Sequence, residues 1–156
     1  MIIRNSTGPG EVVTTKIQLF SRFTIDLVTM YRPPNEYTLE NLEDLLTEHS
    51  SIHPILCVGD LNLPDIDWTR QDQGQIKAES KRKRLHENAL NIFNSNNLQQ
   101  LIKEPTHTKG NTLDLVLADK VLFDDLNIKC EVLPQISDHN MILITVEMQS
   151  TTARYS

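Results

Sequence analysis

Three short apolar runs, each next to polar residues of the kinds used in catalysis, constrain this chain more than any other feature. The runs occupy residues 55–58, 113–117 and 141–144. Apolar runs of this length, bounded by turn residues, predict buried strands. The polar residues placed within or beside them are Asp60, Asn62, Asp114, Asp138 and His139. We therefore expect these side chains to converge at the ends of neighbouring strands.

Each of these residue types has a role in metal-assisted hydrolysis of a phosphodiester. Mg²⁺ takes carboxylate oxygens and keeps several waters, so one or two acids are enough to hold it. The bound cation can polarise a phosphoryl oxygen or lower the pKa of an attacking water. A neutral imidazole can accept the proton of that water when a carboxylate fixes its orientation. The chain supplies each of these groups.

Every one of these segments also has a plain structural interpretation. Gly59 and Asp60 after a buried strand are often only a turn, because Asp bonds its own backbone. Asp114 is harder to dismiss, since an unpaired carboxylate inside an apolar run is costly, and His139 is a plausible partner. Asp138 and His139 alone could form a strand-entry turn. The three segments together, in this order, favour a catalytic site.

Five segments of the chain carry a resemblance to a known family. They are residues 31–34 (YRPP), 58–68 (VGDLNLPDIDW), 104–106 (EPT), 112–116 (TLDLV) and 137–139 (SDH). This combination resembles the endonuclease/exonuclease/phosphatase superfamily, and in particular the apurinic-like endonuclease domain that precedes the reverse transcriptase in non-LTR (LINE-like) retrotransposons. The resemblance covers about residues 17–147.

The resemblance implies roles for residues that would meet the phosphate. Asp60 would position or activate the attacking water, and Asn62 would donate a hydrogen bond to the scissile phosphate. Tyr31 would help to stabilise the phosphate. Such groups act by preorganised stabilisation of the transition state.

The resemblance also implies a histidine–aspartate pair and a metal site. His139 would contact the phosphate and serve in proton transfer, with Asp114 holding its ring. Asp138 would lie at the metal site together with Asp60. The cation implied is Mg²⁺, with Mn²⁺ as an alternative, and the partner implied is DNA through its target-strand phosphates.

The fold implied is α/β, the C-terminal portion of a DNase I-like four-layered sandwich in which helices flank two packed mixed sheets. Residues 1–156 are expected to form one domain that lacks the family's N-terminal part. The family carries an Asn near its amino terminus and a Glu that is the principal metal ligand. No strand-borne counterpart is expected within residues 1–30, because Glu11 follows Gly8, Pro9 and Gly10 in a turn-like context.

Three functions remain open from the sequence. The first is a Mg²⁺-dependent DNA endonuclease of retrotransposon type, inactive if the missing part is needed. The second is a non-catalytic remnant or partner-binding fragment. The third is a phosphatase of the same superfamily, which the retrotransposon-like sequence around Trp68 disfavours. Target preference and oligomeric state are not determined by the sequence.

Composition agrees with an ordinary folded domain. Hydrophobic residues make up 38% of 156 residues and the mean hydropathy is −0.34, so the chain can bury a core. No run of eighteen apolar residues exists, so no membrane span is expected. The amino terminus lacks the apolar segment of a signal peptide. We therefore expect an intracellular protein, nuclear or cytoplasmic.

The net charge is the wrong sign for binding nucleic acid by bulk electrostatics. It is −6 at pH 7, with a pI of about 5.3, whereas DNA-binding domains are usually basic. The one basic concentration is residues 81–84 (KRKR). On a helix these four side chains would radiate around the axis, which favours a solvated helix start. If DNA binds, this run and Arg32 are the first candidates for phosphate contacts.

Periodicity predicts the remaining elements. Strands are expected at residues 12–20, 23–31 and 54–60, and the segment 98–102 is expected to lead into the strand at 113–117. A short strand is expected near Ile128. Helices are expected at residues 38–48, capped by Thr38, and at residues 81–97. Residues 63–80 are expected to be a surface loop anchored by Trp68. His49, His53 and His86 are expected at surfaces, and His107 in a loop. Cys57 and Cys130 are expected to be free core thiols.

Overall fold

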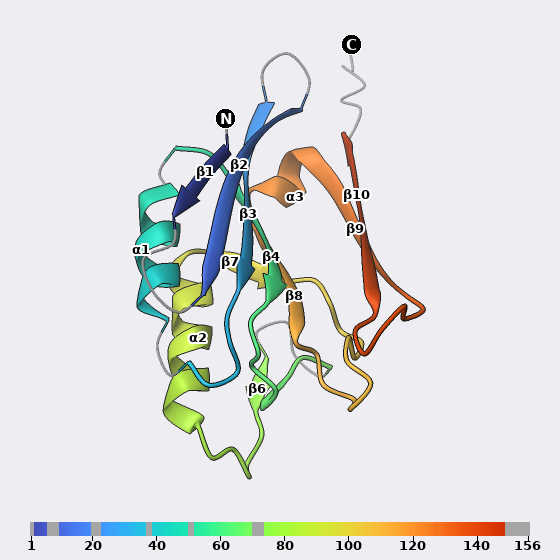
Figure 1. Ribbon diagram of the computed structural model, residues 1–156. Helices are drawn as coiled ribbons and strands as arrows, with labels where there is room; N and C mark the ends of the chain where they lie inside the picture. Colours follow the sequence, from blue (N-terminus) through green and yellow to red (C-terminus); the bar gives the residue numbers. More distant parts are fainter. Residues whose placement is uncertain are drawn as a thin grey trace.

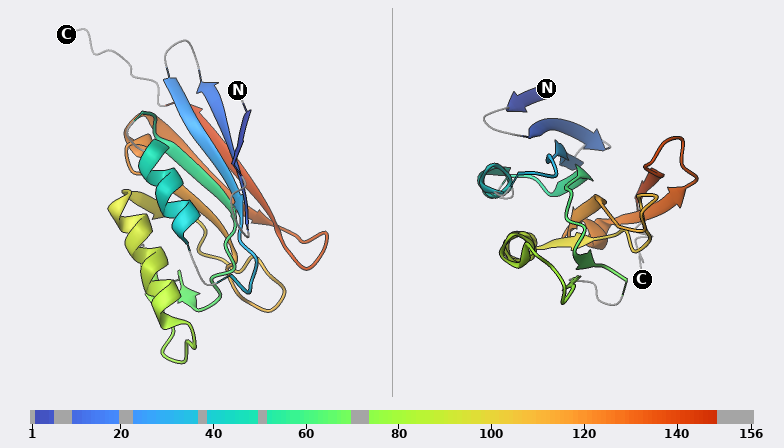
Figure 2. Two further views of the ribbon diagram at one scale, coloured as in Figure 1. Left: turned by 60° about the vertical axis from the view of Figure 1, so that its left-hand side comes forward. Right: turned by 60° about the horizontal axis from the view of Figure 1, so that its bottom comes forward.

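A six-stranded sheet forms the centre of the molecule, with two helices on one face and a two-stranded sheet on the other (Figures 1 and 2). The structure is a computed structural model that describes residues 2–5, 10–19, 23–36, 39–49, 52–69 and 74–148. Within that part of the chain, no helix is long and apolar enough to cross a membrane. The fold is α/β, as the sequence predicts.

The large sheet takes its strands in the order β1-β2-β3-β4-β8-β7. Its strands are β1 (Ile2–Asn5), β2 (Glu11–Leu19), β3 (Phe23–Tyr31), β4 (Ile55–Asp60), β8 (Asp114–Asp119) and β7 (Leu98–Gln100). Only the β3–β4 pair is parallel, and α1 (Glu40–His49) makes the crossover between them. All other neighbours in this sheet are antiparallel. The sheet is therefore mixed.

The remaining elements surround this sheet. They are α2 (Lys83–Ser95), the short helix α3 (Leu122–Asp125), the two-stranded sheet β9 (Leu126–Leu133) and β10 (Met141–Met148), and the small ribbon β5 (Ile66–Asp67) and β6 (Gln75–Ile76). Figure 2 shows α1 and α2 side by side on one face, with the β9–β10 pair on the other. The described residues thus form three of the four layers that the resemblance implies.

Strand alternation sorts the core into two halves. On β4, Ile55 and Cys57 pack toward α1 and α2, whereas Leu56 and Val58 face the β9–β10 pair. Asp60 continues the second series, because side chains at every second position share a face. The polar residue that ends β4 is consequently directed to the side of the sheet that β9 and β10 cover.

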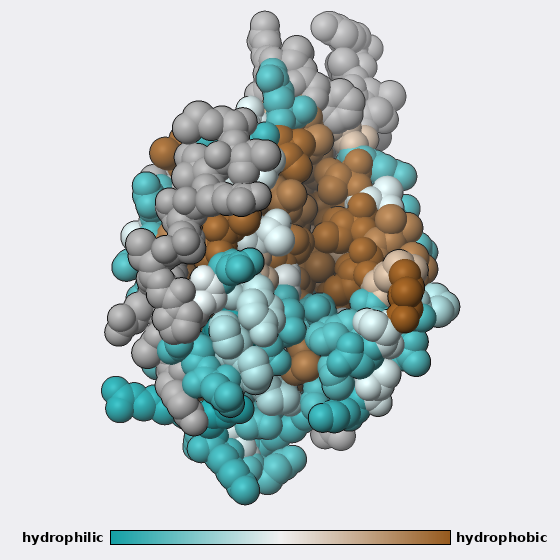
Figure 3. Space-filling model, in the orientation of Figure 1, coloured by the Kyte–Doolittle hydropathy of each residue, from teal (hydrophilic) through white to brown (hydrophobic). Residues whose placement is uncertain are grey.

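The β9–β10 pair covers only part of that side. Its inner face carries cross-strand apolar pairs, such as Cys130 with Ile144 and Ile128 with Val146. The facing side chains of β2 and β3, among them Ile17 and Leu27, remain partly exposed. Figure 3 shows the result as a continuous apolar band between the large sheet and β9–β10, above a polar lower region.

Most predicted elements are present, with shifted ends. The helix expected at 38–48 is α1, and its expected cap Thr38 lies outside the described residues. The strand expected near Ile128 is the eight-residue β9. The structure adds β1 and α3, which periodicity did not predict because each has only four residues. The expected loop at 63–80 contains the β5–β6 ribbon.

Three expectations about the burial of side chains have different outcomes. Trp68 is an anchor as predicted: it is 2% exposed and its ring centroid lies 6.4 Å from that of Phe93 on α2. Both cysteines are free thiols, but only Cys57 is a core residue, whereas Cys130 is partly buried against the core; burial raises the pKa of Cys57 to about 12. His86 was expected at a surface, and this is wrong. It lies on the inner face of α2, fully buried, with Nδ1 2.8 Å from the carbonyl of Arg82.

Candidate functional site

Three predicted site residues form one row across neighbouring strands. Tyr31 at the end of β3 is in register with Asp60 at the end of β4, and Asp60 is in register with Asp114 at the start of β8. Register partners in a sheet share a face. The row therefore brings Tyr31, Asp60 and Asp114 to the same corner of the molecule, on the side of the sheet that β9 and β10 cover.

Gly59 makes the close approach of β3 and β4 possible just before Asp60. Its φ is 149°, and a Cβ placed there would lie 1.8 Å from the carbonyl oxygen of Met30. No side chain fits in that space, and only glycine adopts this backbone conformation easily. The glycine that sequence analysis treated as a turn signal thus fixes the strand end that carries Asp60.

Asp60 and Asn62 form a tight turn beyond β4. The amide of Asn62 donates to Oδ1 of Asp60 at 3.0 Å, and Nδ2 of Asn62 donates to the carbonyl of Arg32 at 2.8 Å. Asn62 has a positive φ of 47°, which Asn tolerates better than most residues. The turn leaves Asp60 half-buried and holds Asn62 beside it.

Arg32 is a structural residue at this turn. The side chain is only 4% exposed and its guanidinium donates to the backbone carbonyls of Leu61, Asn62 and Glu36. Its five donors suit it to tie several carbonyls together. The expectation that Arg32 contacts a phosphate is therefore wrong, because burial and these bonds occupy the group.

His139 reaches the row from the connection between β9 and β10. Its Nδ1 lies 2.8 Å from Oδ2 of Asp114. A carboxylate can only accept here, so Nδ1 carries the proton and Nε2 is left with its lone pair. The partner expected for Asp114 is thus present, and the pair leaves one imidazole nitrogen able to accept a proton.

Thr106 holds the start of β8 in place beneath this pair. Its hydroxyl, fully buried, accepts hydrogen bonds from the amides of Leu113 and Asp114, each at 3.0 Å. The carbonyl of Thr106 also accepts from the amide of Asn140, one residue after His139. One threonine therefore links the strand that carries Asp114 to the segment that carries His139.

Among the residues that the structure describes, two groups of side chains could hold a cation, and both contain His139. In one group the ligand atoms of Asp60, Asp114 and His139 lie within 4.8 Å of one another; in the other the same is true of His107, Asp138 and His139. The predicted ligands Asp60 and Asp138 thus belong to different groups. The side chain of Asp138 is 71% exposed.

The charges of the site act on one another. Burial raises the pKa of Asp60, and the nearby carboxylate of Asp114 raises it further, while the amide of Asn62 opposes both. The hydrogen bond to Asp114 raises the pKa of His139 above its ordinary 6.5. A carboxylate whose charge is disfavoured by burial and by a neighbouring carboxylate is one that a bound cation would stabilise.

The chain is similar to known proteins in both sequence and fold. A family model described as endonuclease-reverse transcriptase matches residues 25–143. The chain belongs to this family. A solved structure, the endonuclease domain of TRAS1, a telomere-specific non-LTR retrotransposon, matches with a TM-score of 0.66 at 16% identity, over 96% of this chain and 68% of that chain. No curated protein matches the chain.

The region that matches the endonuclease-reverse transcriptase family contains the whole row of Tyr31, Asp60 and Asp114. Residues 25–143 include each predicted site residue, from Tyr31 to His139. The likeness to the TRAS1 domain, at 16% identity, shows a shared fold. The roles of the individual side chains stay predictions, and the structure contributes their positions.

The structure changes one expectation about the amino-terminal strands of this family member. Glu11 was expected in a turn, but it is the first residue of β2 and in register with Tyr31; β1 likewise ends at Asn5. The bend at Gly10, directly before Glu11, is the reason that the sequence did not predict a strand beginning there. Glu11 is exposed and extends the row by one strand, with Tyr31 between it and Asp60, and it belongs to neither cation group found among the described residues.

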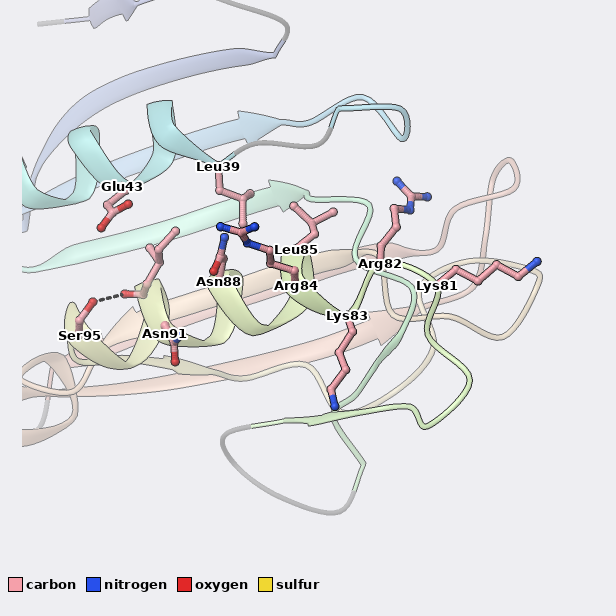
Figure 4. A pocket seen from close by; sticks show the side chains of 11 residues that line it. Leu39, Glu43, Lys81, Arg82, Lys83, Arg84, Leu85, Asn88, Asn91 and Ser95 are labelled. Atoms are coloured by element: carbon pink, nitrogen blue, oxygen red, sulfur yellow. Dashed lines mark hydrogen bonds between the residues drawn. The ribbon is translucent and has the colours of Figure 1, made fainter.

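A groove of about 850 Å³ lies away from this site, between α1 and α2 (Figure 4). Leu39, just before α1, and Glu43 of α1 form one wall, and the basic run at 81–84 stands at one end. In Figure 4 the side chains of this basic run point in different directions, and Arg84 lies over the groove. Lys83 lies 3.8 Å from Glu87. The run does not converge on one point, as expected for a solvated helix start.

His139 offers a direct test of the pair in metal-free protein. Its NMR titration is expected to give a pKa above 6.5, and Asp114→Asn is expected to lower that pKa because the hydrogen bond and the charge are both weakened. The folded state then binds the proton more tightly than the unfolded state does. The pair therefore stabilises the fold below pH 6.5, and this stability is lost as pH rises through the folded pKa. An unchanged titration in the variant would contradict the contact.

Proposed function

We propose that this chain is a metal-dependent phosphodiesterase that nicks DNA, of the retrotransposon endonuclease type. One observation carries the proposal: the 2.8 Å contact between His139 and Asp114, set beside Asp60 at the end of the adjacent strand. This arrangement supplies a proton acceptor with a fixed orientation next to a carboxylate that can position water. Family membership, which rests on residues 25–143, supports the same reaction class.

Each side chain has a distinct part in the proposed reaction. Asp60 positions the attacking water through the carboxylate oxygen that the Asn62 amide does not occupy. Nε2 of His139 takes part in proton transfer while Asp114 holds its ring, an arrangement that typically contributes about 10²–10⁴-fold to a rate. Asn62 and Tyr31 donate hydrogen bonds to the phosphate. Tyr31 is 46% exposed, so its ring is accessible to a large substrate.

The donor set fits a hard divalent cation. Asp60 and Asp114 bring carboxylate oxygens together within 4.8 Å, and, after burial, the charge of Asp114 contributes to the raised pKa of Asp60, as expected where two anions lie close together. The proposed ligands of the cation, Mg²⁺ with Mn²⁺ as a substitute, are Asp60 and Asp138, which belong to the two neighbouring groups that share His139. When bound, such an ion neutralises negative charge on the phosphate.

The proposed partner is DNA, contacted through its phosphates. Within the basic run, Arg82 is joined to the segment that follows β3, since it donates to the carbonyl of Pro34 at 2.6 Å, three residues after Tyr31. A chain with net charge −6 should bind DNA weakly and lose affinity steeply as salt rises. An intracellular location, nuclear or cytoplasmic, belongs to the same proposal.

A substrate panel tests the reaction class. Purified protein with Mg²⁺ is incubated separately with supercoiled plasmid and with sugar and lipid phosphomonoesters at low salt. The proposal predicts conversion of plasmid to the open circular form and no release of phosphate from the monoesters. Phosphate release without nicking would replace the nuclease by a phosphatase with the same chemistry.

A second candidate function is a partner-binding fragment without catalysis. The partly exposed apolar band between β2–β3 and the β9–β10 pair favours it (Figure 3), because contiguous apolar surface often marks an interaction site. It predicts that a folded chain nicks nothing in any divalent cation, and that Asp60→Ala alters no measured property of the chain except local stability.

A further inference from the structure

His107 lies against two of the predicted site residues, although it belongs to a different loop. Its ring centroid is 4.9 Å from that of His139, with the rings at 87° to one another. Its Nε2 is 3.7 Å from Oδ2 of Asp138. The His107 side chain is only 12% exposed, whereas that of Asp138 is 71% exposed. A shielded imidazole thus faces an exposed carboxylate and the edge of the proposed proton acceptor.

The backbone fixes this arrangement. His107 and His139 form an antiparallel bridge, flanked by hydrogen bonds from the amide of Thr108 to the carbonyl of Asp138 and from the amide of Asn140 to the carbonyl of Thr106. Directly opposed residues in such a bridge have neighbouring side chains. The ring of His107 is therefore held next to His139 by main-chain bonds on both sides.

The hydrogen bonds of His107 also fix which nitrogen carries the proton. Its Nδ1 accepts the amide of Lys109 at 3.1 Å. In a neutral ring the other nitrogen, Nε2, must then be the donor, and it is the nitrogen that faces Asp138. A metal ligand needs a lone pair at the coordinating nitrogen, whereas this ring turns its N–H toward Asp138, at 3.7 Å an electrostatic contact longer than a hydrogen bond.

We propose that His107 is a positioning residue of the site: it holds the carboxylate of Asp138 and the ring of His139 in place without contacting the substrate itself. The inference rests on the proposed nuclease function. Without the imidazole, the exposed carboxylate of Asp138 would lose its neighbour in the fold, and the ring of His139 would lose a packed neighbour. Groups that orient ligands and catalytic side chains in this way typically affect metal affinity or activity by about 10–100-fold.

Two substitutions separate this role from a structural one. In His107→Asn the amide oxygen can still accept the Lys109 amide, as Asp60 and Asp67 accept amides two residues on, but the donor to Asp138 and the ring are lost. In His107→Gln a longer amide can again donate to Asp138. We expect His107→Asn to lower kcat for plasmid nicking about 10–100-fold with little change in KM or Tm, and His107→Gln to restore most of the loss.

A matched control lies at the far end of β4. His53 is 3.6 Å from Asp26, so it offers a second histidine–aspartate contact remote from the row. His53→Asn is expected to leave nicking unchanged. Wild-type nicking in His107→Asn would overturn the inference, and so would equal loss in both His107 variants together with a lowered Tm, which is the result of a purely structural role.

A readout without catalysis keeps the inference separate from the proposed function. Mn²⁺ affinity, followed by the relaxation of water protons, is expected to fall about 10-fold or more in His107→Asn and to recover in His107→Gln, because Asp138 is a proposed ligand. If wild-type protein fails to nick DNA while this Mn²⁺ pattern holds, the proposed function fails and the positioning role stands. Equal Mn²⁺ affinity in all three proteins overturns the positioning role.

Discussion

His139→Ala is expected to lower the rate of plasmid nicking by about 10²–10⁴-fold, the range for loss of a positioned acid–base group. The reason lies in the pairing with Asp114, which leaves Nε2 as the nitrogen able to exchange a proton. Because the side chain is about one-third exposed, its loss should cost little stability. Single-turnover nicking rates at fixed Mg²⁺, with circular dichroism to verify folding, measure the effect.

The control for this prediction is His53→Ala, whose ring lies beside Asp26 at the other end of β4. It should nick at the wild-type rate. A His139→Ala protein that is folded and loses less than about 10-fold would remove His139 from proton transfer. The reaction would then depend on another group.

Trp68→Ala is expected to have the largest effect on stability, about 3–5 kcal/mol, the usual cost of deleting a large buried aromatic side chain. Trp68 is 2% exposed and packs on Phe93, while the backbone of Gly74 passes directly over its ring. A Cβ on Gly74 would lie 2.7 Å from Trp68 Cζ3, so the space around the ring is filled. Urea unfolding monitored by far-ultraviolet circular dichroism gives the change in free energy.

The matched variant is Trp68→Phe, which keeps an aromatic ring in the same space and should cost less than half as much. A similar loss in both variants would mean that the ring is not what anchors the segment. A loss below about 1 kcal/mol in Trp68→Ala would contradict the buried contact with Phe93. The segment from Ile66 to Ile76 would then be held mainly by its own ribbon.

The convergence of the site was predictable because each element of the row has a local cause. Apolar runs predict the strands, and strand alternation decides the face on which a side chain projects. Asp114 is the clearest example: a carboxylate within an apolar run needs a partner, and the chain contains a histidine next to an acid just before another strand. The structure places His139 on that carboxylate.

Residues whose position depends on tertiary contacts could not be predicted in this way. His86 follows Leu85 on the buried face of α2, where a polar residue gives no periodic signal. Arg32 was taken as a phosphate contact because its charge is visible in the sequence, whereas the three carbonyls that surround it are not. His107 meets His139 through a bridge between loops thirty-two positions apart, which no local pattern reveals.

The turn residues before Glu11 also led to a wrong prediction. Gly8, Pro9 and Gly10 predict a turn, and a turn is a good reason to doubt a strand. The strand nevertheless begins at once after Gly10, because residues 11–19 pair with β3 along their whole length. Pairing with a neighbouring strand overrides the local preference, and it places an acid in register with Tyr31.

The most direct test of the central claim is metal-dependent nicking by one preparation of the chain. Protein treated with EDTA, and then restored with excess Mg²⁺, is assayed on supercoiled plasmid beside an Asp60→Ala protein handled identically. We expect nicking that is absent in EDTA, returns with Mg²⁺, and is lost in Asp60→Ala at every Mg²⁺ concentration. Nicking that persists in EDTA, or that Asp60→Ala retains in full, would contradict it.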